Sequence, residues 1–479
     1  MGDYRSIVMD ANYIDGIWKK TGNGSLEVKD KYSGEHISYL PMASSEDLER
    51  AIASAVTAKA EFRSWSAGQR AGMLLDMASV LWSHDDEFVE LIIREAGKPR
   101  GYAKTEVDRG IATLKMAAAE ASRFSGEVVP LDFGIGAGKT AITKRIPVGV
   151  VAGITPFNFP LNLVLHKVAP ALAVGCPIII KPAPQAPLTA MALAYLAEVV
   201  GYPAGFIQVL MADNAQAEQL VRDERVAMLS FTGSDKVGWH LKGIAGKKKL
   251  ALELGGNAAV IVDGSTDLEA SAASIATGAY LYAGQICIST QRIYVLENVR
   301  AEFEAALIRN IEKVQSGDPQ KNGVINGPII DKVHVDRIDA WVREAVDSGA
   351  RLLAGGHVLD AAHNIYAPTL LTHTTESMKV CADEVFGPVA VLESVRDFEE
   401  AIERVNAGRF GLQAGVFTNR IDHLRMAHER LEVGGVIIGG VPGFRIDSMP
   451  YGGVKDSGLG REGVRYAMEE MTESRLLVY

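Results

Sequence analysis

VGVVAGITPFNFPLNLVLHKVAPALAVGCPIII, residues 148–180, decides the fold of this chain. Two short runs rich in β-branched residues, VGVVAGI at 148–154 and PIII at 177–180, flank a helical segment, LNLVLHKVAPALA. Gly and Pro bound both runs, as they commonly bound strands. A strand, a helix and a second strand in this order predict a parallel α/β unit.

The same alternation continues along the chain. A predicted helix at 188–200 leads to the strand FIQVLMA and then to VAMLSFTGS, and a second alternation starts near Ala258 with AAVIV and runs through RIYVL, VAVL, GVFT and GGVIIGG. We therefore expect two doubly wound α/β domains, whose ligands bind at the carboxyl ends of the strands. No G-x-G-x-x-G motif follows any of these strands, so a dinucleotide would bind without the usual fingerprint. The closing segment PYGGVKDSGLGREG, rich in glycine and charge, is expected to be a surface loop.

Composition limits the classes of function. The 479 residues carry a formal charge of −10, which argues against a nucleic-acid partner because phosphate binding needs a basic face. The longest apolar run, 168–180, is short and interrupted by Pro and Gly, so no membrane span is expected. Three scattered cysteines without metal-ligand spacing predict no metal site and a reducing, cytoplasmic location.

Three polar residues stand out because of their surroundings. Cys287, in YAGQICIST, follows a tight turn; Glu253, in LALELGGN, ends an apolar strand; Asn158, in ITPFNFP, lies in a loop between a strand and a helix. A buried carboxylate has a raised pKa, which suits a general base, and an amide donates to an oxyanion. The alternatives are a structural thiol, a structural ion pair and a helix cap.

A second hypothesis starts from FGIGAGKT at 133–140, which resembles a nucleotide-binding P-loop. The P-loop pattern requires Gly where this chain has Phe133, and the loop should follow a buried strand and open a helix. The flanking sequences instead predict a glycine-rich hairpin turn. ATP hydrolysis that depends on Lys139 would revive the P-loop hypothesis.

Seven motifs together resemble the aldehyde dehydrogenase superfamily: TPFNFP, KPAP, FTGS, ELGGN, GQICIS, EVFGPV and PYGGVKDSG, in family order and spacing. The resemblance implies a variant Rossmann cofactor-binding domain at 1–126 and 148–253 and a catalytic domain at 254–440. It further implies a β-hairpin at 127–147 that joins the C-terminal strand at 470–479 in a homodimer or homotetramer, and a substrate-pocket loop with a return segment at 441–469.

The resemblance also assigns catalytic roles. Cys287 would attack the aldehyde carbon, with the oxyanion held by the Asn158 side chain and the Cys287 backbone N–H. Hydride transfer would leave a thioester, and Glu253 would activate the water that hydrolyses it. Relatives that pass the acyl group to coenzyme A generally lack this glutamate, so a free carboxylic acid is the expected product. Intact catalytic residues argue against a non-catalytic binding or structural protein on the same scaffold.

The implied cofactor is NADP or NAD. Lys181 would bind the adenosine ribose, Gly233 and Ser234 would open the helix that faces the pyrophosphate, and Glu384 and Phe386 would hold the nicotinamide end. Members that prefer NAD often carry Glu where this chain has Pro184. Because no carboxylate there repels a 2′-phosphate, the sequence favours NADP. The motif positions add three more cofactor contacts, Thr155, Pro156 and Phe157.

The expected substrate is a small polar or anionic aldehyde of the lactaldehyde or glyceraldehyde-3-phosphate type. Arg109 resembles an arginine that binds substrate phosphate in one branch of the family, although a salt bridge would also explain it. The whole pattern is most similar to the lactaldehyde-dehydrogenase-like group, and a semialdehyde dehydrogenase of the succinic semialdehyde type is the alternative. The residues expected to line the substrate pocket are Arg109, Phe159, Asn162, His166, Ile286, Ile288, Phe444, Arg445 and Tyr451.

Overall fold

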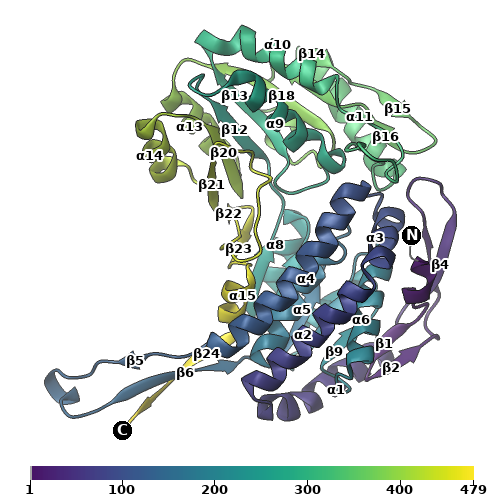
Figure 1. Cartoon of the computed structure of the whole chain (residues 1–479), viewed down its shortest axis with the longest axis vertical. Helices are drawn as coiled ribbons and strands as arrows, with labels where there is room; N and C mark the ends of the chain where they lie inside the picture. Colours follow the sequence, from purple (N-terminus) through teal and green to yellow (C-terminus); the bar gives the residue numbers. More distant parts are fainter. Residues whose placement is uncertain (1–2) are drawn as a thin grey trace.

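The computed structural model describes residues 3–479 and is built around two open α/β sheets. The first has eight strands in the order β2-β1-β9-β8-β7-β10-β11-β23, and the second has seven in the order β14-β17-β18-β13-β12-β20-β21. Figure 1 shows the two sheets with their helices as separate bodies, the second above the first. The prediction of two doubly wound α/β domains is confirmed.

The centre of the first sheet is parallel. Within the stretch that opens the sequence, Val151 of one strand lies opposite Ile178 of the next, with a helix between them in the chain. Both strands are buried at every residue, which explains why they are continuous apolar runs up to Lys181, the last residue of the second strand, instead of alternating ones. The parallel strands are β7 (Val150–Ile154), β8 (Ile178–Lys181), β9 (Ile207–Val209), β10 (Val226–Thr232) and β11 (Lys249–Glu253).

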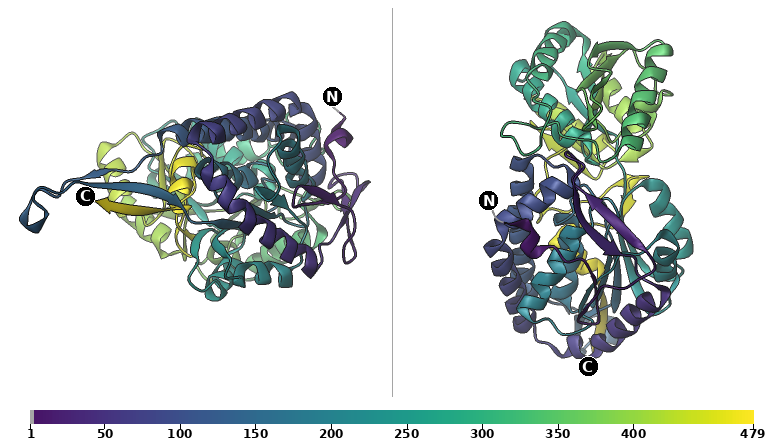
Figure 2. Two further views of the ribbon diagram at one scale, coloured as in Figure 1. Left: turned by 90° about the horizontal axis from the view of Figure 1, so that it is seen from below. Right: turned by 90° about the vertical axis from the view of Figure 1, so that its right-hand side faces the viewer.

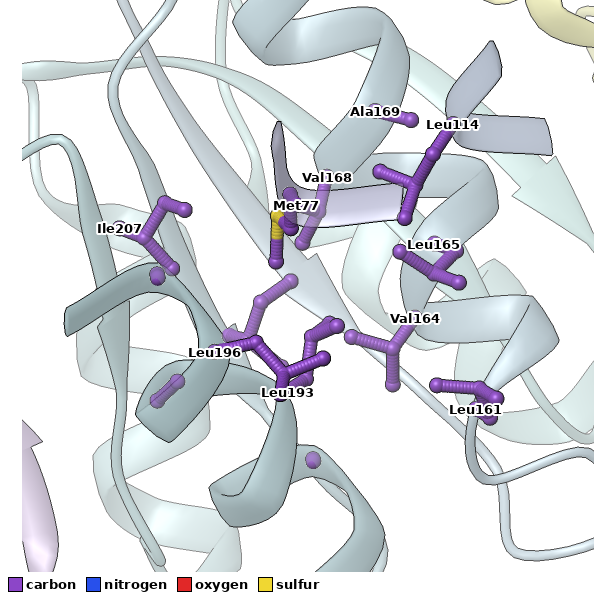
Figure 3. Packing of buried hydrophobic residues seen from close by; sticks show 14 of the residues in the cluster. Met77, Leu114, Leu161, Val164, Leu165, Val168, Ala169, Leu193, Leu196 and Ile207 are labelled. Atoms are coloured by element: carbon purple, nitrogen blue, oxygen red, sulfur yellow. The ribbon is translucent and has the colours of Figure 1, made fainter. Parts of the chain in front are cut away.

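Helices cover both faces of this sheet. One face carries α1 (Ser45–Ser64), α7 (Asn214–Arg222) and α8 (Asp235–Ile244), whose apolar residues form one core cluster with the strands. The other face carries α5 (Asn162–Val174) and α6 (Leu188–Val200), and a second helical layer of α2 (Ala67–Ser83), α3 (Asp85–Ala96) and α4 (Arg100–Arg123) packs on them (Figures 1 and 3).

Helix α5 is a middle layer, buried at every one of its residues. A helix enclosed on all sides is normally apolar all round. Figure 3 shows Val164, Leu165 and Val168 of this helix pointing into the cluster that Leu114 of α4 and Leu193 of α6 also fill. The polar residues that α5 nevertheless carries therefore need polar partners inside the protein.

The N-terminal strands extend the first sheet at one edge. Strand β1 (Asn12–Ile14) pairs antiparallel with β9 and with β2 (Ile17–Lys19), after the short 3-10 helix η1 (Tyr4–Ile7). Strands β3 (Ser25–Lys29) and β4 (His36–Pro41) form a separate antiparallel pair beside them. In Figure 1 this N-terminal part of the chain lies at the right of the first domain.

The second domain repeats the doubly wound plan. Along β12, Val260 and Val262 face a cluster with α9 and α10, whereas Ala259 and Ile261 face a cluster with α13 and α14. This alternation places helices on opposite faces of the sheet. The strands are β12 (Ala258–Val262), β13 (Thr290–Leu296), β14 (Arg351–Ala354), β17 (Thr369–Thr372), β18 (Val389–Val395), β20 (Gln413–Phe417) and β21 (Gly435–Ile438), with β15 (Val358–Asp360) and β16 (Ile365–Tyr366) outside the sheet; the helices are α9 (Leu268–Tyr280), α10 (Arg300–Ile311), α11 (Lys332–Asp347), α12 (Lys379–Ala382), α13 (Phe398–Ala407) and α14 (Ile421–Arg430).

The chain returns from the second domain to the first through the glycine-rich closing segment. Strand β22 (Val454–Lys455) pairs with β19 (Phe410–Gly411) of the second domain, and β23 (Gly458–Leu459) pairs with β11 of the first. Ser457 and Glu462 are buried, and α15 (Val464–Glu470) packs on α5. The expectation of a surface loop here was wrong, because the segment pairs with a strand of each domain.

A hairpin projects away from both domains (Figures 1 and 2). Its strands β5 (Val128–Val129) and β6 (Ala141–Pro147) form a three-stranded sheet with the C-terminal strand β24 (Thr472–Val478). The stretch FGIGAGKT lies at the exposed tip, where the only helical piece is the one-turn η2 (Gly134–Gly136). Since no helix follows Lys139 and no buried strand precedes the loop, the P-loop hypothesis is wrong.

Across residues 3–479 no helix is both long and apolar enough to cross a bilayer. The same residues hold no group of three or more His, Cys, Asp or Glu side chains placed to bind a metal ion.

Candidate active site

A cavity of about 1310 Å³ lies where the two domains meet. Its walls include the last residues of four parallel strands, Ile154, Lys181, Thr232 and Glu253, as expected for a doubly wound sheet. Loops of the second domain close the other side. The predicted site residues that line this one cavity are Arg109, Thr155, Pro156, Phe157, Asn158, Phe159, Asn162, Lys181, Gly233, Ser234, Glu253, Ile286, Cys287, Ile288, Glu384, Phe386, Phe444, Arg445 and Tyr451.

Cys287 lies just beyond a strained turn. Tyr282 and Ala283 both have positive φ, at 51° and 53°, a conformation uncommon for residues with a side chain. Gly284 follows with φ 67°, and a Cβ there would meet the Gly387 carbonyl oxygen at 2.1 Å, so only glycine fits. The Gln285 side chain holds the turn in position with three hydrogen bonds. It donates to the carbonyls of Tyr282 and Pro328 and accepts from the Ile330 N–H.

The thiol of Cys287 faces the cavity in an enclosed setting. Burial raises its pKa to about 12, because the thiolate is poorly solvated there, and a hydrogen bond with Tyr451 opposes part of that rise. The Sγ to Oη distance is 3.2 Å. The Asn158 side-chain amide reaches the same loop and donates to the Gln285 carbonyl at 2.9 Å. An amide has two N–H donors, so the second stays available to an oxyanion in the cavity.

Glu253 is buried at the carboxyl end of β11. Neither of its carboxylate oxygens has a hydrogen-bond partner within the described residues. Burial, followed by repulsion from the Glu462 carboxylate, raises its pKa well above the ordinary range, while Arg445 and Lys167 oppose the rise. A carboxyl group whose pKa is pushed upwards inside a cavity is suited to accept a proton near neutral pH.

One end of the cavity has the features of a dinucleotide site. Ser234 caps α8, so the free N–H groups at the start of that helix face the cavity and suit an anion. Lys181 is buried there, with its pKa lowered by burial, and its ammonium group has no hydrogen bond or ion pair to any residue within 3–479. The hydroxyl of Thr155 is also buried without a partner. These unpaired groups fit a bound dinucleotide, which would supply their partners.

Glu384 and Phe386 enter the cavity from the second domain. The Gly256 N–H donates to the Glu384 carboxylate at 2.9 Å, and burial raises the pKa of that carboxylate to about 7. A Cβ on residue 255 would lie 2.5 Å from the same carboxylate. This close approach explains why the first of the two glycines that follow Leu254 has no side chain. Phe386 packs edge-on against Phe157, with ring centroids 5.9 Å apart.

The other end of the cavity is polar. Asp447 accepts from Arg109 at 2.6 Å (Nη2) and 3.2 Å (Nε), from the His166 Nε2 at 2.8 Å and from the Asn162 amide at 3.4 Å. Arg445 donates to His166 Nδ1 and to Glu462, both at 3.0 Å. Seven side chains are thus connected, and we call them the polar cluster: Arg109, Asn162, His166, Lys167, Arg445, Asp447 and Glu462.

The prediction for His166 needs correction. Arg109 and Arg445 line the cavity as expected, but His166 is 2% exposed and lies behind the wall. Its imidazole bridges Asp447 and Arg445, and it does not line the cavity, unlike Asn162 one turn earlier in α5. The salt bridge considered for Arg109 exists as well, to Asp447, while the arginine still lines the cavity.

A buried ion pair supports the loop that carries Asn158. Lys98, just before α4, pairs with Glu106 of that helix, and Glu106 also accepts from the backbone N–H groups of Leu161 and Asn162 at 3.0 Å each. The Lys98 ammonium lies 3.5 Å from the centre of the Phe159 ring. This pair fixes the start of α5, and with it the residues that the helix and the preceding loop present to the cavity.

Sequence reasoning missed Lys98, Glu106, Lys167, Asp447 and Glu462. Lys167 gave a usable signal, because a lysine inside a continuous apolar helix requires a buried partner. That partner is Glu462, at 2.9 Å, and the Lys167 ammonium also donates to Ser230 and Thr232. The other residues gave no comparable signal in the sequence.

Comparison with known proteins identifies the class. The aldehyde dehydrogenase family model matches residues 18–477. The chain is 42% identical over 468 residues to 3-sulfolactaldehyde dehydrogenase of Priestia aryabhattai, covering 97% of each chain. It is 35% identical over 471 residues to lactaldehyde dehydrogenase of Methanococcus aeolicus, covering 97% of this chain and 99% of the relative. The solved structure of glyceraldehyde-3-phosphate dehydrogenase GapN from Methanocaldococcus jannaschii, complexed with NADP, superposes with a TM-score of 0.91 at 36% identity, covering 95% of this chain and 99% of the other.

The chain belongs to the aldehyde dehydrogenase family. It is an oxidoreductase that acts on aldehydes with a nicotinamide dinucleotide, NAD or NADP. The resemblance to the lactaldehyde-dehydrogenase-like group is confirmed by curated relatives that match nearly the whole chain.

Proposed function

We propose that the chain oxidises a small, hydroxylated or anionic aldehyde to the free carboxylic acid through a covalent thioester on Cys287. One observation carries the proposal: Cys287, Glu253 and Asn158 line the same cavity as the dinucleotide site and three members of the polar cluster, Arg109, Asn162 and Arg445. The relatives named for lactaldehyde and sulfolactaldehyde support the same substrate class. NADP is the proposed cofactor, because Pro184 on the cavity wall leaves the 2′-position free of a carboxylate at that point.

The proposed chemistry starts at Cys287. Its thiol gives its proton to solvent water, and the sulfur adds to the aldehyde carbon, which converts the carbonyl oxygen into an oxyanion. The free N–H of the Asn158 amide and the Cys287 backbone N–H donate to that oxyanion, in an enclosed site where such bonds are strong. A dinucleotide held by Lys181, Ser234, Glu384 and Phe386 would supply the hydride acceptor for the same carbon, and Cys287 would then carry a thioester.

Glu253 acts as the general base for hydrolysis of the thioester. Its carboxylate takes a proton from water, the resulting hydroxide adds to the thioester carbon, and the Cys287 sulfur leaves as the carboxylic acid forms. Burial and the nearby Glu462 hold the Glu253 pKa high, so the carboxylate is a stronger base than an exposed glutamate. The strained turn before Cys287 and the Lys98–Glu106 pair hold sulfur and amide in position.

Substrate and cofactor can be tested together. Purified protein is assayed with NAD or NADP against lactaldehyde, glyceraldehyde 3-phosphate, 3-sulfolactaldehyde, succinic semialdehyde and an apolar medium-chain aldehyde, by the absorbance of the reduced nicotinamide. We expect the highest kcat/KM on a hydroxylated small aldehyde with NADP, and no activity in Cys287→Ala. Best turnover on the apolar aldehyde would contradict the substrate assignment, and best turnover on succinic semialdehyde would favour the semialdehyde alternative.

We also propose that the projecting hairpin pairs with a second copy of the chain. Val128, Phe133 and Ile135 on the hairpin and Leu476 and Leu477 on β24 are exposed, and strand edges with exposed apolar side chains invite pairing. Light scattering of the full chain against a variant lacking 130–139 tests this. A dimer or tetramer that falls apart in the variant supports the proposal, and an unchanged mass contradicts it.

A further inference from the structure

The hydrogen bonds of the polar cluster define the charge of His166. A guanidinium only donates, so the 3.0 Å contact from Arg445 requires His166 Nδ1 to be an acceptor. The proton of the ring must then be on Nε2, which donates to Asp447 at 2.8 Å. His166 is therefore neutral, and burial, together with the nearby Arg445 charge, lowers its pKa in agreement.

Asp447 stays ionised in this setting. Burial by itself would raise its pKa, but hydrogen bonds from His166 and Arg109 outweigh burial and place the pKa well below the ordinary range. Its two carboxylate oxygens accept hydrogen bonds from Nε and Nη2 of Arg109. The Nη1 side of that guanidinium has no protein partner within residues 3–479, although Arg109 lines the cavity. Asp447 thus orients Arg109, and the Nη1 N–H groups of that guanidinium remain free to donate to a ligand.

Arg445 also keeps a spare donor. Its Nε is buried without a hydrogen-bond partner among residues 3–479, its Nη2 donates to His166 and Glu462, and the side chain lines the same cavity. The guanidinium is further held 3.6 Å from the centre of the Tyr451 ring. Two fixed guanidinium groups with unused N–H donors suit an acid group of a ligand.

The net charge of the polar cluster is +1. Arg109, Lys167 and Arg445 are cations, Asp447 and Glu462 are anions, and His166 and Asn162 are neutral. A sulfonate or carboxylate carries one negative charge, whereas a phosphate monoester carries about 1.5 to 2 at neutral pH. The cluster balances the first kind of group and leaves the second with excess negative charge near Asp447, which is buried behind Arg109 and does not itself line the cavity.

We propose that Asp447 is a positioning residue that sets specificity: it aims Arg109 and limits the charge of the pocket, so that hydroxyaldehydes with a singly charged acid group are preferred to phosphorylated ones. This inference rests on the proposed function and deepens it. The ligand class is a three-carbon 2-hydroxyaldehyde whose third carbon bears a sulfonate or carboxylate. Phosphate esters of the same length are bound less well because Asp447 repels their second charge.

The test compares 3-sulfolactaldehyde with glyceraldehyde 3-phosphate, which differ at the acid group, and uses neutral lactaldehyde as reference. The quantity measured is the ratio of kcat/KM values for sulfonate over phosphate. Wild type should prefer the sulfonate at pH 7.5. Asp447→Asn raises the cluster charge by one unit and should move the ratio towards the phosphate on the order of tenfold, mainly through KM. Asp447→Glu should keep the wild-type preference.

Two controls separate a charge effect from damage to the fold. Asp223→Asn removes a carboxylate from another arginine pair, outside the cavity, and should leave the ratio unchanged. A second measurement needs no substitution: lowering the pH from 7.5 to 5.5 converts phosphate monoesters towards the monoanion, so the wild-type ratio should fall while the sulfonate keeps its charge.

The outcomes are distinguishable. If wild type oxidises none of the three aldehydes, the proposed function fails and the inference fails with it. If wild type is active but Asp447→Asn lowers all three kcat/KM values equally, Asp447 has only a structural role. A wild-type ratio that favours phosphate at pH 7.5, or does not change with pH, overturns the inference even where Asp447→Asn does not fold.

Discussion

Replacing Glu253 with Gln should stall the reaction after hydride transfer. The amide has nearly the same shape as the carboxyl group, and neither Glu253 oxygen has a hydrogen-bond partner to lose. The nucleophile, the Asn158 amide and the dinucleotide site are untouched. Loss of a general base costs about 10²- to 10⁴-fold in the step that uses it. We therefore expect thioester hydrolysis to slow by that factor while thioester formation changes less than about tenfold.

Rapid mixing with excess aldehyde and cofactor measures both steps in one trace. The Glu253→Gln variant should release a burst of about one reduced nicotinamide per subunit, followed by a steady rate at least about 100-fold below wild type. Glu253→Asp, which keeps a carboxyl group on a shorter side chain, is the matched variant and should retain more of the steady rate. A variant that loses the burst and the steady rate equally would refute the assignment, because Glu253 would then act at or before hydride transfer.

The same substitution has a consequence for stability. A carboxyl group whose folded-state pKa is raised contributes fully below its unfolded pKa of about 4.3 and loses that contribution as the pH rises through the folded pKa. Glutamine does not ionise, so Glu253→Gln should gain stability relative to wild type as the pH rises above neutral. Thermal unfolding of the two proteins at pH 6 and pH 9 measures the difference, and a relative loss at pH 9 would show that Glu253 is not held in its neutral form by burial.

Three further predictions follow from single residues. Pro184→Glu places a carboxylate where a 2′-phosphate would bind, so KM for NADP should rise about tenfold while KM for NAD changes little; equal effects on both cofactors would contradict the site. Glu106→Gln leaves the buried Lys98 ammonium without its counter-ion and should cost about 3–5 kcal/mol in the free energy of unfolding, measured in denaturant; a loss under about 1 kcal/mol would show that the pair is not structurally important. With a pKa of about 12, Cys287 in cofactor-free protein should react with iodoacetamide about tenfold faster for each pH unit from 7 to 10, and a plateau near pH 8 would contradict that pKa.

Much of the fold could be predicted because its signals are local. The runs at 150–154 and 178–180 are apolar at every position, as is typical of strands buried on both faces. The expectation for the segment 450–463 failed for a non-local reason. Its glycines and charges are typical of an exposed loop, but the glycines let it pass close to Glu253 and Leu252, and Glu462 is neutralised by Lys167 and Arg445.

The three proposed catalytic residues were easier to find from the sequence than the polar cluster. Cys287, Glu253 and Asn158 each lie in a short local motif, and these motifs were recognised because seven of them occur together in family order and spacing. The positions of Asp447 and His166 depend on three elements packing together, α4, α5 and the loop before β22, which are far apart in the sequence. Motif spacing predicted that His166 would line the substrate pocket. In the structure its imidazole is buried behind the cavity wall.

The most direct test of the central claim is to find the acyl group on Cys287. Glu253→Gln is mixed with aldehyde and cofactor, quenched in acid within the burst, and analysed by peptide mass spectrometry. We predict that the peptide containing Cys287 gains the mass of the substrate acyl group, and that Glu253→Gln combined with Cys287→Ala shows no such gain. An unmodified Cys287 peptide during the burst, or the acyl group on Cys176 or Cys381, would contradict the account.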